Sequence, residues 1–172
     1  MNYLDIFDSA KVWIKYVHFL NRKYYKNNFL EIGAGIGSFT DKYKRNIKNI
    51  FLTEIDKNNL NILKKKYQND TNVTILESEV TKISQKFNTI CHFNVLEHVK
   101  EDKEEIINCL NKINKDGYLI ILAPAHNELY GNLDREVGHY RRYKKSFFKH
   151  LNLSDGKIVE LKYMDCMGYI LY

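Results

Sequence analysis

Short apolar runs recur along the chain between longer stretches in which apolar residues return every three or four positions. Such runs are typical of strands buried in a parallel sheet, and the longer stretches have the period of amphipathic helices. Strands are predicted at residues 29–32, 50–53, 73–76, 89–93, 118–123 and 157–163. The alternation predicts an α/β fold, with a doubly wound and mostly parallel sheet and helices on both faces.

Helices are predicted between these strands from the helical period and from local end signals. They cover residues 1 to about 26 and begin near residues 38, 56, 101 and 144. Ser38 suits the N-cap of the second helix, and Asp56 suits the N-cap of the third. The fourth helix is expected to carry Ile113 on its apolar face and to end at Gly117.

Composition narrows the class of protein. A chain of 172 residues that is 44% hydrophobic can bury one sizeable core, which favours a single domain. No apolar run approaches the roughly 20 residues of a membrane span, and Asp5 and Asp8 disfavour a secretory signal peptide. The odd number of cysteines without C-x-x-C spacing indicates reduced thiols and a cytoplasmic location. We assign no residue to a metal ion.

The formal net charge of +6 comes from scattered lysines, which is typical of a solvated surface. Nucleic-acid binding favours basic residues that gather on one face between aromatics, and only residues 141–149 approach that pattern. The charge therefore gives little support to a nucleic-acid partner.

The segment FLEIGAGIGSF at residues 29–39 carries the most specific chemistry. A predicted strand runs into Gly33, Gly35 and Gly37, as at the start of a nucleotide-binding βα unit. A dinucleotide fingerprint would need glycine at Ser38 and no acid at Glu31, because a carboxylate repels phosphate. An acid there would instead attract a cationic amino-acid group. A glycine turn without a ligand is the alternative interpretation.

The pattern E-x-G-x-G-x-G closely resembles the first motif of class I S-adenosylmethionine-dependent methyltransferases. The resemblance implies that S-adenosylmethionine binds here and leaves as S-adenosylhomocysteine. It assigns the amino-acid end of the cofactor to Glu31, Gly33, Ala34, Gly35 and Gly37. It assigns the ribose to Glu54, beside Ile55, since a carboxylate can accept hydrogen bonds from both vicinal hydroxyls, and Asp56 is the alternative acid for this role. The adenine side or the sulfur is assigned to Glu79, Val80, Asn94 and Val95.

Two further segments resemble a bacterial subgroup of small-molecule methyltransferases. They are NVLEH at residues 94–98 and GHYRRY at residues 138–143, and the resemblance runs from about residue 28 to 150. Amino methyltransferases of adenine or cytosine usually carry Asp/Asn-Pro-Pro-Tyr/Phe where this chain has NVLEH, whereas the single proline of this chain is Pro124. Methylation of a nucleic acid is therefore disfavoured. The expected acceptor is an oxygen or nitrogen of a small, sugar-linked or lipid-linked molecule.

The loops at residues 124–143 are expected to wall the acceptor pocket, because loops after the later strands overhang the ligand in open α/β sheets. Candidate acceptor-binding residues are Tyr130, Tyr140, Arg141 and Arg142. The arginines could bind a phosphate or carboxylate, or could pair with Asp134, Glu136 or helix carbonyls and fix the loop. Candidate general bases are His98, His126 and His139, and for any one of them a structural role is the alternative.

The resemblance leaves the end of the sheet open. The family's sheet has seven strands, and here the seventh is expected to be missing. We divide the chain into residues 1–27 (helical segment), 28–125 (cofactor core) and 126–172 (acceptor side). Either a longer protein or a partner such as a second copy would cover the exposed edge and the apolar tail at 168–172.

Three alternative functions stay open: a protein that binds the cofactor without catalysis, a nicotinamide oxidoreductase and an RNA methyltransferase.

Overall fold

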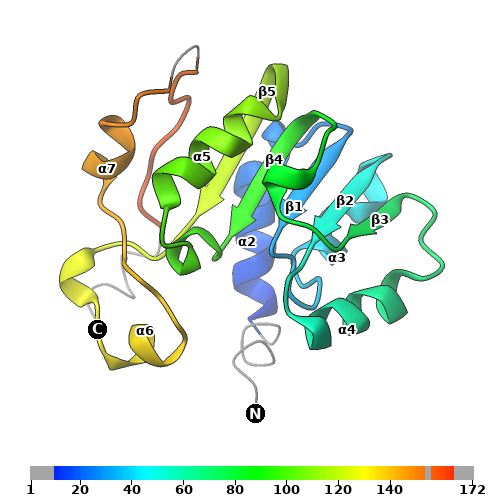
Figure 1. Cartoon of the computed structure of the whole chain (residues 1–172), viewed down its shortest axis with the longest axis horizontal. Coiled ribbons are helices and arrows are strands. Elements are labelled where there is room, and N and C mark those ends of the chain that lie inside the picture. The colour runs from blue at the N-terminus through cyan, green and yellow to red at the C-terminus, as the bar shows by residue number, and fades with distance from the viewer. Residues whose placement is uncertain (1–9, 154–155, 165–172) are drawn as a thin grey trace.

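Five parallel strands form one sheet at the centre of the structure (Figure 1), a computed structural model that describes residues 10–153 and 156–164. The strands are β1 (Phe29–Ile32), β2 (Ile50–Thr53), β3 (Val73–Leu76), β4 (Phe87–Phe93) and β5 (Ile113–Leu122). Their order across the sheet is β3-β2-β1-β4-β5. The α/β fold with a parallel sheet is confirmed, and the first three strands have the predicted bounds.

The strand order reverses at β1. The chain winds outward from β1 to β3 and then returns to place β4 on the other side of β1. In open α/β sheets ligands bind outside the carboxyl ends of the strands at this point of reversal. The segments that follow β1 and β4 therefore meet there.

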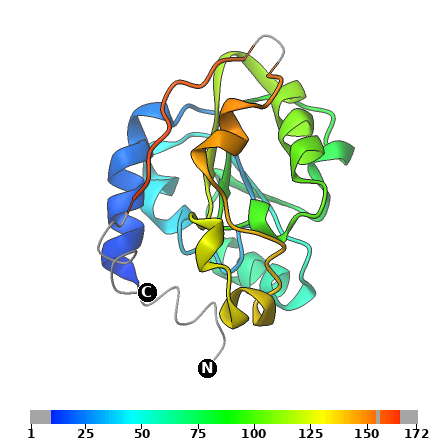
Figure 2. The same cartoon turned by 90° about the vertical axis from the view of Figure 1, so that its left-hand side faces the viewer.

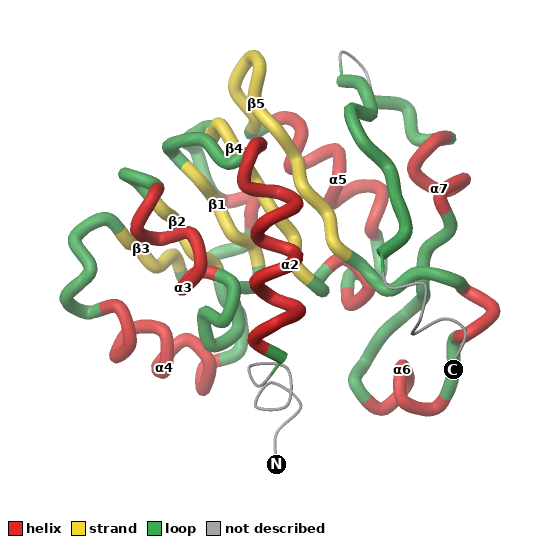
Figure 3. Tube along the Cα trace, turned by 180° about the vertical axis from the view of Figure 1, so that it is seen from behind, coloured by secondary structure: helices red, strands yellow, loops and turns green. Residues whose placement is uncertain are grey.

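Helices cover both faces of the sheet (Figures 2 and 3). The α-helices are α2 (Lys11–Asn21), α3 (Thr40–Tyr43), α4 (Lys57–Tyr67), α5 (Asp102–Asn111), α6 (Asn132–Glu136) and α7 (Lys145–Lys149). The 3-10 turns are η1 (Arg22–Tyr24), η2 (Lys44–Asn46), η3 (Val80–Lys82), η4 (Leu96–His98) and η5 (Asn127–Leu129). In Figure 3, α2 crosses the near face of the sheet, and α5 lies on the far side. None of the helices in the described ranges is long and apolar enough to cross a membrane.

Alternate residues of β1 supply two separate cores. Phe29 packs with residues of α2, α3 and α4 on one face, including Ile14 and Tyr43. Leu30 packs on the other face with Ile90 of β4 and Cys109 of α5. Because successive strand residues point to opposite faces, a strand buried on both sides is apolar throughout, apart from functional positions.

The predicted continuation of the fourth helix to Gly117 is wrong. Helix α5 ends at Asn111, and Ile113 begins β5 by pairing with Phe87. The next aligned pair is Thr89 with Tyr118, so the residues between bulge from the ladder. A Cβ on Gly117 would lie 2.9 Å from the Asn88 carbonyl oxygen, which explains a glycine here. Helical periodicity cannot distinguish an apolar residue in a helix from one in a strand that follows directly.

Of the two predicted N-caps, one is wrong and one is confirmed. Helix α3 begins after Phe39, not Ser38, and no side chain caps it. Asp56 caps α4, accepting a hydrogen bond of 2.9 Å from the Asn59 amide. Phe39, the residue at the N-cap position of α3, stacks on Phe93 with ring centroids 4.4 Å apart. The described part of the N-terminal helix lies within its predicted range.

The predicted sixth strand at 157–163 is wrong. This segment has no regular secondary structure, and its apolar residues Ile158 and Val159 are 42% and 57% exposed. Its Glu160 instead accepts a hydrogen bond of 2.8 Å from the Tyr24 hydroxyl. Apolar alternation alone did not produce a strand, because no ladder pairs the segment with β5. The predicted apolar tail at 168–172 lies outside the described residues.

Candidate active site

The glycine turn after β1 is held by hydrogen bonds and by side chains that tolerate no Cβ. Gly33, Gly35 and Gly37 all have positive φ, at 63°, 57° and 80°. A Cβ on Gly33 would lie 2.8 Å from a methyl carbon of Val95, and one on Gly37 would lie 2.8 Å from the Tyr67 ring. The Tyr67 hydroxyl also donates to the Gly37 carbonyl at 2.8 Å. The predicted roles of these glycines in the backbone therefore have a direct geometric cause.

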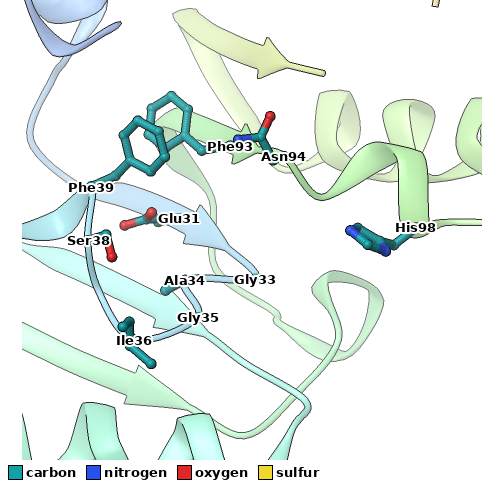
Figure 4. A pocket seen from close by; sticks show the side chains of 10 residues that line it. All are labelled: Glu31, Gly33, Ala34, Gly35, Ile36, Ser38, Phe39, Phe93, Asn94 and His98. Atoms are coloured by element: carbon teal, nitrogen blue, oxygen red, sulfur yellow. The ribbon is translucent and has the colours of Figure 1, made fainter. Parts of the chain in front are cut away.

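A pocket opens at this turn (Figure 4). Its lining comes from the end of β1, the glycine turn, the end of β4 and η4, and consists of Glu31, Gly33, Ala34, Gly35, Ile36, Ser38, Phe39, Phe93, Asn94 and His98. The stacked rings of Phe39 and Phe93 form an apolar wall, whereas Glu31, Asn94 and His98 supply polar groups. The pocket thus lies where the strand order predicts a ligand.

Glu31 forms part of the pocket lining and is 2% exposed. One carboxylate oxygen accepts hydrogen bonds from the hydroxyls of Thr40 and Tyr43. Burial raises the pKa of Glu31 to about 7, although these two hydrogen bonds lower it in part. The side chain therefore changes charge close to neutral pH.

Glu54 is directed at the backbone in this structure. One of its oxygens accepts from the Gly35 amide at 2.8 Å, and the other accepts from the amides of Ile55 and Asp56 at 2.7 and 2.8 Å. The carboxylate thereby ties the end of β2 to the glycine turn. These bonds use three of the roughly four acceptor sites of a carboxylate, which leaves one where two vicinal hydroxyls were predicted. Glu54 is 8% exposed and is not part of the pocket lining, and its assignment to the ribose stays a prediction.

The other predicted cofactor residues are divided between the pocket and its surroundings. Asn94 lines the pocket, and Val95 packs against Gly33. Val80 is buried in the core that contains Leu30 and Cys109, on the face of the sheet that α5 covers. Glu79 is exposed, pairs with Lys82 at 3.4 Å and is not part of the lining. Its assignment to adenine stays a prediction.

The structure separates the three candidate bases. His98 lines the pocket, and its ring packs edge-on against His139 with centroids 4.7 Å apart. His126 has left-handed backbone, contacts Glu128 at 3.2 Å and packs on Tyr163, outside the lining. His98 and His139 are thus brought together, and His126 is not.

The candidate acceptor-binding residues fix the loop that carries them. Arg142 donates to Asp134 at 2.8 Å, and Arg141 pairs with Asp102 at 2.8 Å and donates to the Lys100 carbonyl. Arg142 thus has a partner that the loop-fixing alternative named, whereas the partners of Arg141 are others that also fix the loop. The Tyr130 hydroxyl donates to the His139 carbonyl at 2.6 Å, and Tyr140 is 55% exposed. A role of these four in acceptor binding stays a prediction.

Sequence reasoning gave Glu97 no role of its own and named Asp134 only as a possible partner of the arginines, although both acids are buried beside the pocket. Glu97 is 0% exposed and Asp134 is 1% exposed. Glu97 belongs to the NVLEH segment, and Asp134 precedes the GHYRRY segment. In each case the available signal was an acidic residue among apolar or aromatic neighbours. The pocket-lining Phe39 and Phe93 were also unassigned.

One curated relative is the ribosomal RNA small subunit methyltransferase A of Wigglesworthia glossinidia brevipalpis. It is 28% identical over 147 residues, which are 77% of this chain and 56% of the relative. The chain therefore spans little more than half the length of that relative.

Two solved structures share the fold. The magnesium protoporphyrin IX methyltransferase of Synechocystis PCC 6803, with bound SAH, matches with a TM-score of 0.66 at 14% identity over 88% of this chain and 75% of that chain. Coclaurine N-methyltransferase, bound to N-methylheliamine and SAH, matches with a TM-score of 0.67 at 17% identity over 83% of this chain and 48% of that chain.

A family model described as a methyltransferase domain matches residues 7–157. This range contains every described strand, the glycine turn and all residues that line the pocket. The family depends on S-adenosylmethionine. The chain belongs to this methyltransferase domain family.

Proposed function

We propose that this chain binds S-adenosylmethionine on the glycine turn and transfers its methyl group to an oxygen or nitrogen of a small-molecule acceptor. The observation that carries the proposal is the pocket over Gly33–Ile36, with the buried acid Glu31 at its base and the end of β4 beside it. A cationic amino-acid group and an apolar thioether chain match this combination of an acid and aromatic walls.

The residues fit this cofactor. Glu31 would hold the ammonium group, since hydroxyls already fix one of its oxygens in place. The positive-φ glycines leave the turn without side chains, so that the ligand can approach the main chain. Glu54 would hold the ribose from its position at the end of β2. When bound, the cofactor supplies a methyl group activated by a sulfonium.

The chain itself contributes orientation and exclusion of water. Phe39 and Phe93 shield one side of the pocket, and Asn94 holds the polar edge beside them. His98, at the opposite end of the lining, faces the place where an acceptor would approach. In-line approach at close range contributes more to such a transfer than strong acid–base assistance does.

A small-molecule acceptor is supported by the NVLEH and GHYRRY segments, which resemble a bacterial small-molecule subgroup. Both solved structures named above belong to enzymes whose names specify small molecules. The acceptor would enter beside His98 and beneath the loop that carries Gly138–Tyr143.

Calorimetric titration with S-adenosylhomocysteine tests the proposal. We expect saturable binding that NAD does not displace and that Glu54→Ala weakens. Glu77→Ala is the matched control, because this acid is exposed, pairs with Lys64 and lies outside the lining. Circular dichroism would verify that each variant is folded. Displacement by NAD, or the absence of binding to folded protein, would refute the proposed cofactor.

An RNA acceptor is the second candidate, favoured by the similarity to a ribosomal RNA methyltransferase. It predicts RNA binding that weakens steeply with salt, because cationic side chains release counterions from phosphates. A small-molecule enzyme would show no such binding. Cofactor binding without transfer to either class of acceptor would support the non-catalytic alternative.

A further inference from the structure

Three potential metal ligands converge at the acceptor end of the pocket. Glu97 and His98 belong to η4, and His139 comes from the loop after α6. Their ligand atoms all lie within 4.8 Å of one another. A backbone hydrogen bond of 2.8 Å from the Tyr140 amide to the Glu97 carbonyl joins the two segments. The cluster is therefore fixed by the main chain and does not depend on side-chain reach alone.

Two of the three side chains are buried with ligand atoms that have no partner. Glu97 is 0% exposed, and neither of its carboxylate oxygens makes a hydrogen bond to another of the described residues. The Nε2 atom of His139 also has none, lies 3.9 Å from Glu97 Oε1 and belongs to a side chain that is 7% exposed. A buried polar group without a partner destabilises a fold, so such a group calls for an explanation.

A second carboxylate orients His139. Asp134 Oδ1 lies 2.8 Å from His139 Nδ1, and Asp134 is itself held by Arg142 and by the Gly131 amide. An acid beside Nδ1 selects the tautomer that carries its proton there, which leaves a lone pair on Nε2 directed toward Glu97. Metal-ligating histidines typically donate their other ring N–H to a carboxylate or carbonyl in this way.

We propose that Glu97, His98 and His139 bind a divalent transition metal ion, of which Zn²⁺ is the working example. Two imidazoles and one carboxylate suit zinc or ferrous iron better than magnesium or calcium, and three protein ligands leave coordination positions open. A cation at this point gives the orphaned atoms of Glu97 and His139 a partner. His98 lines the pocket, so the open positions are accessible from it.

The role of the ion rests on the proposed function, whereas its binding does not. If the chain is a methyltransferase, the ion would hold an oxygen or nitrogen atom of the acceptor beside the cofactor. This points to acceptors that carry a metal-binding hydroxyl, carboxylate or amine. Direct coordination would position that atom more strictly than hydrogen bonds could.

A second cluster, His92, Glu105 and Cys109, provides the internal comparison. Its ligand atoms already contact one another, with His92 Nε2 3.3 Å from Cys109 Sγ and 3.6 Å from Glu105 Oε1. The cluster lies between β4 and α5 and does not line the pocket. We expect no ion there.

The test is a calorimetric titration of the chelator-stripped full chain with Zn²⁺ alone, with Mg²⁺ in a parallel experiment. We expect one Zn²⁺ per chain and no saturable binding of Mg²⁺. His98→Ala should weaken Zn²⁺ binding at least about tenfold. This side chain is exposed, so its removal should leave the fold intact. Glu97→Gln should have a similar effect, and Glu105→Gln should bind as the wild type does.

Thermal unfolding provides a second readout, because an ion that binds the folded state raises its melting temperature. Zn²⁺ should raise the Tm of the wild type and of Glu105→Gln, and should not raise that of His98→Ala. No saturable Zn²⁺ binding, or binding unchanged in both His98→Ala and Glu97→Gln, would overturn the site. If S-adenosylhomocysteine still binds in that case, the proposed function survives without the metal.

Discussion

The acidic side chains at the two ends of the pocket differ in how many hydrogen-bond partners they have. At the cofactor end, Glu31 accepts from two hydroxyls, and Glu54 accepts from three backbone amides. At the acceptor end, Glu97 is fully buried, and neither of its carboxylate oxygens makes a hydrogen bond to another residue within the described ranges. Asp134 beside it is bound by Arg142 and His139. The cofactor end is therefore complete by itself, whereas the acceptor end contains groups that require something further.

This difference indicates that the two ends of the pocket have different roles. A turn that must hold the same cofactor in every cycle benefits from acids that are already oriented, because preorganised groups lose little freedom on binding. Unsatisfied ligand atoms at the other end are explained by a cation between them. The following variants probe each end in matched pairs, beginning with the largest expected effect.

Adding a methyl group at a glycine should affect the two ends unequally. Gly37→Ala combines left-handed backbone with a Cβ 2.8 Å from the Tyr67 ring, and should lower the free energy of unfolding by roughly 3 kcal/mol. Gly138→Ala has similar φ, but its nearest neighbour is His98 Nδ1 at 3.8 Å, so it should lose about 1 kcal/mol. Urea denaturation measures both. Equal losses would show that the turn is not tightly packed.

Removing a buried tyrosine hydroxyl should also destabilise the protein more at the cofactor end than at the acceptor end. Tyr43 donates to the buried Glu31, and Tyr43→Phe should lower the free energy of unfolding by about 2 kcal/mol. Tyr143 donates within a group that includes Asp102, which also pairs with Arg141 at 2.8 Å. Tyr143→Phe should therefore lose only about 1 kcal/mol. The reverse order in urea denaturation would contradict the account of a complete cofactor end.

Cofactor affinity should depend on pH through Glu31, whose pKa of about 7 results from burial. Ionisation is needed to attract an ammonium, so S-adenosylhomocysteine should bind about tenfold more tightly at pH 8 than at pH 6. Glu31→Gln, which keeps an acceptor for Thr40 and Tyr43, should bind weakly and without this rise. A pH-dependent rise retained in Glu31→Gln would assign the effect to another group.

The same ionisation should affect stability in the opposite direction. The folded-state pKa of Glu31 lies above its ordinary value of 4.5, so the folded state holds the proton more tightly than the unfolded state. Its contribution to stability is present below pH 4.5 and is lost as pH rises through about 7. The difference in urea midpoint between wild type and Glu31→Gln, followed from pH 5 to 8, measures this loss.

The smallest effect is expected at Glu79. Its side chain is exposed, pairs with Lys82 and lies outside the lining, so Glu79→Gln should change affinity for S-adenosylhomocysteine less than about twofold. Glu54→Gln should weaken binding more strongly. A large loss in Glu79→Gln would instead support the assignment of this acid to adenine.

The cofactor end could be predicted from sequence because its determinants are local. A short apolar run followed by alternate glycines defines both β1 and its turn, and Asp56 caps the helix that it immediately precedes. The start of the fifth strand was harder to predict. Ile113 pairs with Phe87, and this pairing decides where α5 ends, but helical periodicity does not reveal it.

The acceptor end could be predicted only in part, because His98 and His139 were candidates but the contacts that bury Glu97 beside them are not local. Glu97 is a residue of a recognisable segment, but its burial depends on the loop that docks His139 and Tyr140 against it. The segment at 157–163 has a strand-like composition, yet nothing in its own sequence determines whether β5 pairs with it. Long-range partners decide both cases.

A crystal structure of the full chain grown with S-adenosylhomocysteine and Zn²⁺, with data collected at the zinc edge, tests the contrast between the two ends most directly. The account predicts ligand density over Gly33–Gly37 with the amino group at Glu31, and an anomalous peak between Glu97, His98 and His139. Ligand density away from the glycine turn, or an anomalous peak at His92 and Cys109 in place of this site, would contradict it.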